Sequence, residues 1–463
     1  MPAIPVIAVF DIGKTNKKLL LFDEQYQLVW ERSDRLAETV DEDGMPCEDL
    51  QLLEQWLRDA GKEVLQHRDF DVRAINFAAY GASFVYLNEQ GEPHAPLYNY
   101  LKQYPPQLLE QFYNTYGGME AFAVATASPP LGSLNSGLQL YRIKQEQERL
   151  FAHTLYALHL PQFASFVFTG EASTDITSIG CHTGLWDFKA DKYHPWVKAE
   201  AWTNKLPLIQ PAETTFPLFG YRTTVKVGIG LHDSSAALIP YLLYFKEPFL
   251  LLSTGTWCIT LNPFNQLPLT YDELQQDCLC YLSYKEQQVK ASRLFAGNEH
   301  EQETARIAAH FGVAPNFYES VQYDAHLFAN ILPRKKDLQQ KGQGLKDSGF
   351  GHRMLDAFAN PSHAYHQLIW DMAQQQYAAT MLVSMGGQER RLFVDGGFSK
   401  NEVYVHALAA VFTGCEVFAA AMPQATALGA ALVLHEKWNK TALPQNLIQL
   451  KRYHAPAEMV TTG

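Results

Sequence analysis

The chain has 463 residues, a formal net charge of −12 and 47% apolar residues. This length exceeds what one hydrophobic core usually supports, so we expect a globular protein of two domains, or of three. The acidic balance, without a long basic run, argues against a primary role in binding nucleic acid or a membrane surface. The N-terminus has no signal-peptide pattern, and no apolar run approaches the ~20 residues of a membrane span, so we expect a cytoplasmic protein.

The six cysteines are sparse and follow neither a disulfide framework nor the spacing of a zinc site. We expect buried free thiols in a reduced compartment, the alternative being metal binding. Cys278 and Cys280 form a C-x-C pair, and on a strand both thiols would point to the same side.

Residues 6–22 predict a β-hairpin, because two apolar runs flank a short polar turn. The turn contains Asp11, Gly13, Thr15 and three lysines. Backbone N–H groups around a glycine approach phosphate oxygens, lysines neutralise them, and a carboxylate holds Mg²⁺ directly or through water. The turn therefore fits a polyphosphate and its metal. The alternative is an ordinary hairpin whose turn happens to be basic.

A layered α/β domain is predicted after the hairpin. Residues 48–67 place apolar residues at helical spacing, while 72–79 and 84–87 predict a buried strand and a returning strand. Residues 103–165 are mainly helical, and the Ser/Thr/Gly-rich stretch 173–188 predicts a loop or a ligand-facing segment. The order strand, helix, strand indicates an α/β fold.

The second half of the chain repeats the opening design. Residues 225–239 predict a strand that breaks at glycines and enters a helix, and 240–248 is the candidate domain boundary. Residues 249–261 again combine an apolar strand, a Ser/Thr/Gly turn and a second apolar strand. This weak repeat of organisation predicts that the second domain resembles the first.

The remaining segments are predicted from periodicity and turn residues. They are a helix from 299 to 311, an exposed polar loop over 331–351, a long helix over 364–385, a strand at 391–394, helices over 403–412 and 424–434, and a peripheral tail from about 437.

Four polar breaks follow strands or their glycine-marked ends, at residues 11–18, 231–235, 253–256 and 395–401. Ligands of α/β folds gather at such strand ends, so the four breaks together indicate one site. Asp233 is the candidate catalytic base, because a carboxylate there can accept a proton from a substrate hydroxyl that attacks phosphorus. The alternative is an aspartate that caps a helix N-terminus.

The later two breaks offer phosphate contacts. Residues 253–256 read Ser-Thr-Gly-Thr and supply hydroxyls and a glycine backbone. Gly396 and Gly397 lie between a predicted strand and helix, where paired glycines let the backbone approach a flat or phosphorylated ligand. The alternative for these glycines is a tight β-to-α turn.

The set of motifs, in this order, resembles the FGGY carbohydrate kinases, which have the actin-like ATPase fold. The motifs are D-x-G-x-T-x-x-K at 11–18, H-D-S-S-A-A at 232–237, S-T-G-T-W at 253–257, V-D-G-G-F-S-K-N at 394–401 and Q-A-T-A-L-G-A-A at 424–431. The second and third motifs look most like the rhamnulokinase branch. The resemblance covers the chain from about residue 6 to 435.

The resemblance implies an α/β fold of two ribonuclease-H-like domains around a cleft, at 1–240 and 241–440, with a C-terminal tail at 441–463. It also implies ATP and Mg²⁺, with Asp11 at the metal and Asp233 as base. It assigns phosphate contacts to Gly13, Thr15, Lys18, Thr254, Gly255 and Thr256, and adenosine contacts to Gly396, Gly397, Asn401 and Gln424.

The sugar-binding motifs depart from the family. Where relatives carry W-x-D-x-R or Y-R-D-x-R, residues 98–102 read Tyr-Asn-Tyr-Leu-Lys, without the acid and the arginine. Candidate sugar contacts beside Asp233 are Ser83, Tyr98, Asn99, His182 and Thr183.

The leading hypothesis is a sugar kinase that phosphorylates a terminal hydroxyl of a ketose or deoxyketose such as L-rhamnulose or L-fuculose. The alternatives are a catalytically impaired sugar- or nucleotide-binding sensor, and a kinase of the same family for a pentulose or polyol. The expected partner is a small-molecule sugar, and the sequence leaves a homodimer open.

Overall fold

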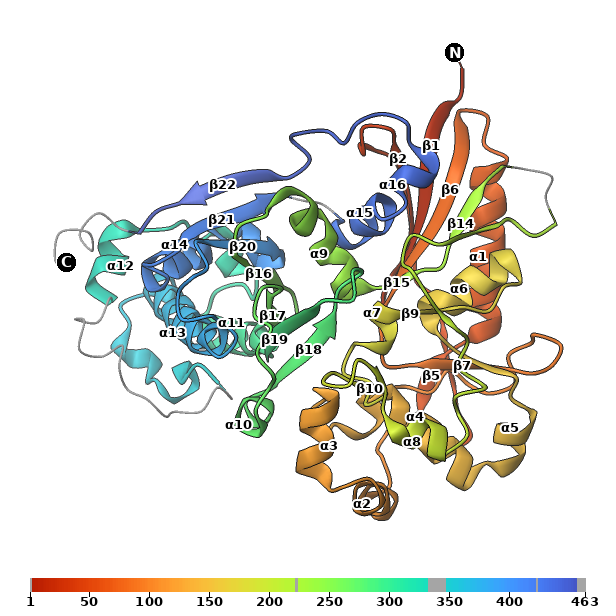
Figure 1. Cartoon of the computed structure of the whole chain (residues 1–463). Helices are drawn as coiled ribbons and strands as arrows, with labels where there is room; N and C mark the ends of the chain where they lie inside the picture. Colours follow the sequence, from red (N-terminus) through yellow and green to blue (C-terminus); the bar gives the residue numbers. More distant parts are fainter. Residues whose placement is uncertain (1, 221–223, 332–346, 422–423, 456–463) are drawn as a thin grey trace.

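A computed structural model describes residues 2–220, 224–331, 347–421 and 424–455. Two mixed seven-stranded sheets form the centres of two α/β domains (Figure 1). The predicted loop at 331–351 lies mostly outside the described residues.

The first sheet is built around the central strand β1, whose residues 6–10 are fully buried, as their continuous apolar run predicts. The strand order is β13 (Thr215–Pro217), β14 (Lys226–Gly228), β6 (Phe70–Ala79), β1 (Ile4–Ile12), β2 (Lys17–Asp23) and β3 (Leu28–Asp34), with β15 (Leu231–His232) also paired to β6. β1 and β2 form the predicted antiparallel hairpin, and β1 runs parallel to β6.

The second sheet repeats this plan, which confirms the predicted similarity of the two domains. Its order is β18 (Cys278–Leu282), β19 (Gln288–Leu294), β17 (Cys258–Asn262), β16 (Phe249–Thr254), β20 (Arg391–Gly396), β21 (Glu416–Ala421) and β22 (Gln449–Tyr453). β16 is antiparallel to β17 and parallel to β20, just as β1 is antiparallel to β2 and parallel to β6.

Helices cover both faces of each sheet (Figure 1). The outer face of the first sheet packs against α1 (Leu50–Leu65) and α6 (Leu160–Thr169), and that of the second against α11 (Ala296–Phe311), α13 (Pro361–Met381) and α14 (Glu402–Val411). Two helices lie between the sheets, α9 (Asp233–Tyr244) and α15 (Ala425–Leu432). One hydrophobic cluster therefore contains residues of both inner faces and of both middle helices.

The structure corrects three sequence-based expectations. The predicted returning strand, β7 (Phe84–Leu87), pairs with β8 (Tyr156–His159) in a separate ribbon rather than with the main sheet. Residues 173–188 are almost entirely buried and include the short helix α7 (Ile176–Ile179), so the loop alternative is wrong and the ligand-facing segment stays a prediction. The tail is not peripheral, because β22 forms the edge strand of the second sheet.

The helix α9 runs through Pro240, the residue at which the predicted boundary begins. Because proline has no N–H, α9 lacks the backbone hydrogen bond from residue 240 to the carbonyl of Ala236. All six cysteines are free, and five are buried. Cys278 and Cys280 point to the same side of β18, as the C-x-C spacing predicts. In the described part of the chain, no helix is both long and apolar enough to cross a membrane.

Candidate active site

The sheet topology brings Asp11 and Asp233 to the same edge of the first domain. Asp11 lies near the end of β1 and pairs in register with Ala78 of β6. Leu231 of β15 pairs with the same residue, Ala78, from the other side of β6. Asp233 follows two residues later as the first residue of α9. Two carboxylates that are 222 positions apart in the chain thus approach one another across a single strand.

Their proximity appears in the pKa of Asp11, which is raised to about 7 by burial and then by the charge of Asp233, while Lys18 opposes the shift. The Asp11 carboxylate makes no hydrogen bond or ion pair within the described residues. A divalent cation would relieve this repulsion, so the donor set fits Mg²⁺. Within the described residues no group of three or more His, Cys, Asp or Glu forms a complete metal cage. One or two carboxylates suffice for Mg²⁺ when phosphate oxygens and water supply the other ligands.

The two oxygens of Asp233 have different environments. Oδ1 accepts hydrogen bonds from the Ser234 amide at 2.6 Å and the Ser234 hydroxyl at 3.3 Å, and it lies 3.3 Å from His232 Nε2. Oδ2 has no protein partner among the described residues. The carboxylate is therefore held through one oxygen, while the other remains available to a proton from a ligand.

His232 is buried behind Asp233. Its Nε2 atom lies 3.0 Å from Cys181 Sγ, and its Nδ1 atom has no partner. Because a buried N–H without an acceptor costs more than a buried lone pair without a donor, the tautomer with the proton on Nε2 is favoured. In that tautomer His232 donates toward Asp233, which supports a role for His232 in orienting the carboxylate.

The lysines of the first hairpin are already engaged. Lys14 pairs with Glu38 at 2.8 Å, Lys17 is buried against Glu48 at 2.7 Å, and Lys18 lies 3.3 Å from Glu31. Lys18 also donates to Gln424 Oε1 at 3.2 Å, across to the start of α15. The turn therefore carries less free positive charge than its sequence indicates. Gly13 forms the tight turn by donating to Asn16 O at 3.0 Å, and Thr15 is exposed.

Two of the predicted sugar contacts use their hydroxyls inside the protein. Ser83 donates to the carbonyl of Tyr98 at 3.3 Å, and Thr183 donates to the carbonyl of Ile179 at 2.6 Å. Both side chains are buried. His182 is also buried, but its Nδ1 atom has no partner and its backbone has a φ of 41°. A strained backbone together with an unpartnered ring nitrogen is typical of a ligand-binding position.

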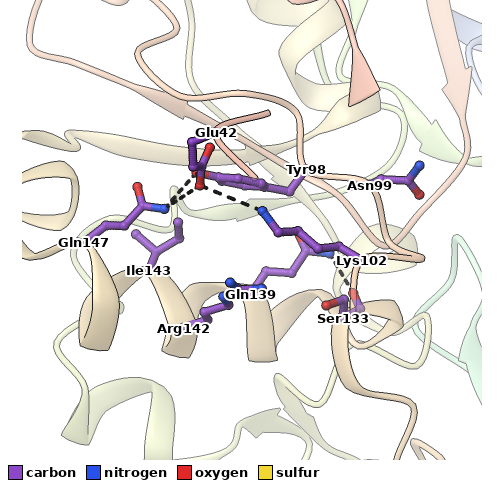
Figure 2. A pocket seen from close by; sticks show the side chains of 9 residues that line it. All are labelled: Glu42, Tyr98, Asn99, Lys102, Ser133, Gln139, Arg142, Ile143 and Gln147. Atoms are coloured by element: carbon purple, nitrogen blue, oxygen red, sulfur yellow. Dashed lines mark hydrogen bonds and ion pairs between the residues drawn. The ribbon is translucent and has the colours of Figure 1, made fainter. Parts of the chain in front are cut away.

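Tyr98 and Asn99 line a small polar cavity beside α4 (Ser136–Glu146) rather than the edge that carries Asp233 (Figure 2). The Tyr98 hydroxyl donates to Glu42 at 2.9 Å and accepts from Gln147 at 2.9 Å. The cavity volume is about 20 Å³, which fits about one water molecule and not a sugar. The cavity is lined by Glu42, Tyr98, Asn99, Lys102, Ser133, Gln139, Arg142, Ile143 and Gln147.

The second domain holds a pocket of about 600 Å³, within the range of small-molecule sites. It collects four of the predicted nucleotide contacts, namely Gly255, Thr256, Gly397 and Asn401. The pocket is also lined by residues of α11 and of the turn that follows it, which the sequence did not single out. They are Gly297, Asn298, His300, Glu301, Tyr318, Glu319, Val321 and Gln322.

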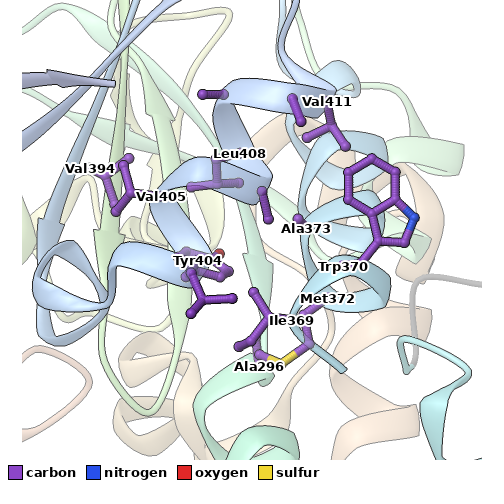
Figure 3. Packing of buried hydrophobic residues seen from close by; sticks show 14 of the residues in the cluster. Ala296, Ile369, Trp370, Met372, Ala373, Val394, Tyr404, Val405, Leu408 and Val411 are labelled. Carbon is purple, nitrogen blue, oxygen red and sulfur yellow. The ribbon is translucent and has the colours of Figure 1, made fainter. Parts of the chain in front are cut away.

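Asn401 is fixed by the outer core of the second domain. Its Oδ1 caps α14 by accepting from the Tyr404 amide at 3.1 Å, and its Nδ2 donates to the Tyr365 hydroxyl at 2.7 Å. Figure 3 shows the apolar side chains, among them Ile369 and Leu408, that pack α13 against α14 behind it. This packing positions the start of α14 at the pocket.

Thr254 and Gly396 join the two phosphate-loop candidates to one another. The Thr254 hydroxyl donates to Asp395 O at 2.5 Å and accepts from the Phe398 amide at 2.9 Å. Gly396 has a φ of 85°, and a Cβ there would lie 2.0 Å from Thr254 O. Only glycine fits this close approach. Gln424 lies outside the pocket, at the first hairpin, where it contacts Lys18.

The two sheets share one plan, a pair of carboxylates lies at one edge of the first sheet, and the second domain holds a pocket large enough for a nucleotide. Together these features define an actin-like ATPase fold. Residues 6–239 match the N-terminal domain of the FGGY family of carbohydrate kinases, and residues 246–442 match the carbohydrate kinase FGGY C-terminal domain. The chain belongs to this family, so it is a sugar kinase, a phosphotransferase with an alcohol group as acceptor. A search of curated proteins finds no match.

Several solved structures share the fold. A carbohydrate kinase from Novosphingobium aromaticivorans has a TM-score of 0.78 and 23% identity, over 99% of this chain and 96% of its own. From Lactobacillus acidophilus, a xylulose kinase and a gluconate kinase each have a TM-score of 0.78 and 15% identity, over 98% and 99% of this chain and 94% of their own. Since these structures carry other substrate names, the rhamnulokinase branch stays a prediction.

Proposed function

We propose that the protein is an ATP-dependent kinase that phosphorylates a terminal hydroxyl of a ketose or deoxyketose, with Asp233 as general base. The observation that carries the proposal is the asymmetry of Asp233, whose Oδ1 is held by neighbouring groups while Oδ2 has no partner. In this proposal the first domain, residues 1–240, binds the sugar, and the second, residues 241–440, binds ATP. Among sugars, the xylulose kinase names favour a pentulose, and the H-D-S-S-A-A and S-T-G-T-W motifs favour L-rhamnulose or L-fuculose.

In the proposed reaction the acceptor hydroxyl lies between Asp233 Oδ2 and the γ-phosphorus of ATP. The acceptor oxygen forms a bond to this phosphorus, and its proton passes to Oδ2. The bond from the γ-phosphorus to the β–γ bridging oxygen breaks, and its electron pair leaves with ADP. Gly255, Thr256 and Gly397 offer backbone groups to the phosphates from the second domain. Mg²⁺, which Asp11 would hold, would supply countercharge to the phosphate oxygens.

The test is Asp233→Asn in a coupled ADP-release assay over D-xylulose, D-ribulose, L-rhamnulose, L-fuculose and the corresponding polyols. Asparagine keeps the size of the side chain and an oxygen that can accept from Ser234, but it accepts no proton. We expect sugar-stimulated turnover to fall by about 10²- to 10⁴-fold with unchanged ADP binding. Asp49→Asn, at the N-cap of α1, is the matched control and should leave turnover unchanged.

Wild-type turnover in Asp233→Asn would remove Asp233 from the mechanism. The absence of sugar-stimulated ADP release from the wild-type protein, across the whole panel, would instead favour the sensor.

A further inference from the structure

Arg293 points into the space between the two domains. On β19 the next residue, Leu294, belongs to the hydrophobic cluster on the outer face of the second sheet. Ala291, two residues before Arg293, belongs to the hydrophobic cluster between the two sheets, here called the inner cluster. Side chains alternate between the faces of a strand, so Arg293 lies on the inner face. Its strand partner in β17, Ile259, packs against the same inner cluster.

The guanidinium of Arg293 is only partly satisfied. Its side chain is 8% exposed, and a single amino group donates to Asp277 Oδ1 at 2.6 Å. The Nε–H is buried and has no partner. The guanidinium also lies 5.2 Å from the ring of Trp257. Trp257 directly follows Thr256, one of the predicted phosphate contacts, in the sequence. Since a guanidinium has five N–H donors and buried donors are normally paired, this arrangement is typical of a group that completes its hydrogen bonds with a ligand.

Arg293 lies on a wall formed by β18 and β19, and this wall faces the wall that carries α7, His182 and the candidate base Asp233. β18 packs on the end of α7, where the Leu282 amide donates to Gly180 O at 3.1 Å. This contact places the Tyr281 ring 5.7 Å from His232, in a stacked arrangement, and 6.2 Å from His182. The Tyr281 hydroxyl has no hydrogen bond within the described residues.

Strained backbone occurs on both walls. Asp277, the partner of Arg293, has a φ of 61°, and His182 on the opposite wall has a φ of 41°. Positive φ strains the backbone of a non-glycine residue, and such residues cluster where a ligand requires a fixed geometry. The two walls therefore hold unpartnered polar groups of Arg293, Tyr281 and His182 around one space.

The charges of this space favour a neutral ligand. Asp277 already balances the charge of Arg293, and Asp11 and Asp233 add negative charge nearby. The geometry points to Arg293 as a sugar-binding residue of the second domain, whose free N–H groups donate to two adjacent oxygens of a neutral ketose held at Asp233. This inference rests on the proposed function and names the part of its substrate site that the second domain contributes.

A sugar held in this way touches both domains, because Asp233 belongs to the first domain and Arg293 to the second. Sugar affinity would then depend on the approach of the two walls. Arg293 would supply a guanidinium to the sugar from the inner face of β19.

The experiment compares Arg293→Met and Arg293→Lys with Lys290→Met. Lys290 lies on the same strand three residues earlier, on the opposite face, and pairs with Glu273 at 2.8 Å, so it matches Arg293 in burial and in ion pairing. Arg293→Lys keeps the ion pair with Asp277 and serves if Arg293→Met does not fold. ADP release is measured against ketose and ATP concentration, with the neutral ketoses of the panel and D-gluconate.

We expect KM for the ketose to rise about ten- to a hundredfold in both Arg293 variants, with kcat within a few-fold and KM for ATP unchanged. Lys290→Met should keep the wild-type KM. An unchanged ketose KM in both Arg293 variants would reduce Arg293 to a structural ion pair. A loss of kcat together with a loss of sugar-independent ATP hydrolysis would assign Arg293 to the phosphoryl group instead, and preference for D-gluconate would overturn the neutral acceptor.

A thermal-shift measurement of ketose binding distinguishes a failure of this inference from a failure of the proposed function. If the wild-type protein releases no ADP, the kinase proposal fails. A ketose-induced shift that is present in the wild type and Lys290→Met and absent in both Arg293 variants then still supports the inference. A wild-type protein that neither turns over nor binds any ketose of the panel overturns both.

Discussion

Histidines buried in the first domain make its stability sensitive to acid. His159 makes one hydrogen bond, in which its Nε2 atom lies 3.0 Å from the Ser136 hydroxyl, and its Nδ1 atom has no partner. Burial, and then the charge of His232, lowers the pKa of His159 to about 3. The unfolded chain binds a proton near pH 6.5 and the folded protein does not. The contribution of His159 is therefore full above pH 6.5 and is lost progressively as the pH falls toward 3.

We expect His159→Gln to reduce the slope of unfolding free energy against pH by about 1.4 kcal/mol per pH unit between pH 6 and pH 4.5. Urea unfolding at a series of pH values measures this slope. Asp175, whose pKa burial raises to about 7, contributes a slope of the opposite sign, but it cancels in the comparison of variant and wild type. His326→Gln, at an exposed position of α12 (Ala325–Ile331), is the control. Equal slopes in the wild type and His159→Gln would contradict the prediction.

The candidate residues that the sequence predicts best are those that end strands. Asp11 and Asp233 follow apolar runs, and their meeting depends only on which strands pair with β6. Arg293 could not be found in this way, because its role depends on which face of β19 it occupies and on a contact with a distant wall. Tyr98 shows the same limit, since its hydroxyl is taken by Glu42 and Gln147, which no local pattern connects to it.

At the scale of elements, the packing of α9 against α15 depends on one glycine. A Cβ on Gly429 of α15 would lie 1.8 Å from the carbonyl oxygen of Ala236 in α9. Backbone atoms cannot yield as a flexible side chain can, so a methyl group must separate the two helices. Since α9 begins with Asp233, the separation would also displace the candidate base.

We expect Gly429→Ala to lower the free energy of unfolding by about 2 kcal/mol or more, the upper part of the range for overpacked cores, and to lower turnover per folded molecule. Thermal or urea unfolding measures the first effect and ADP release the second. Gly414→Ala is the matched control, because a Cβ at Gly414 meets nothing within 4 Å. Equal stability of the two variants would mean that the helices adjust at little cost.

Elements with continuous apolar runs or helical periodicity were predictable, among them β1, β16, α1 and α13. The strand β22 was not, because only its last residue, Tyr453, is buried and its other side chains face solvent, at least in part. An edge strand of this kind is defined by backbone pairing with β21 rather than by a hydrophobic pattern.

At the scale of the whole molecule, each of the two helices between the sheets, α9 and α15, packs against the sheet of the other domain. α9, which belongs in sequence to the first domain, reaches the second sheet, where the Tyr241 hydroxyl donates to Asp395 at 3.1 Å. α15, which follows the second sheet, returns to the first, where Asn76 of β6 donates to the carbonyl of Ala430 at 2.7 Å. Neither sheet therefore has a complete inner layer without the other domain.

This exchange predicts one cooperative unfolding transition, although chains with two domains commonly unfold in separate steps. In scanning calorimetry we expect a single peak whose calorimetric and van't Hoff enthalpies agree. MgADP, which binds in the proposal to the second domain alone, should move the entire peak, by about 2.7 kcal/mol of stability at a hundredfold excess over its Kd. A second peak that nucleotide leaves in place would show that the inner cluster does not couple the domains. The hydrogen bond from Tyr241 to Asp395 also joins the second sheet directly to the helix that begins with Asp233.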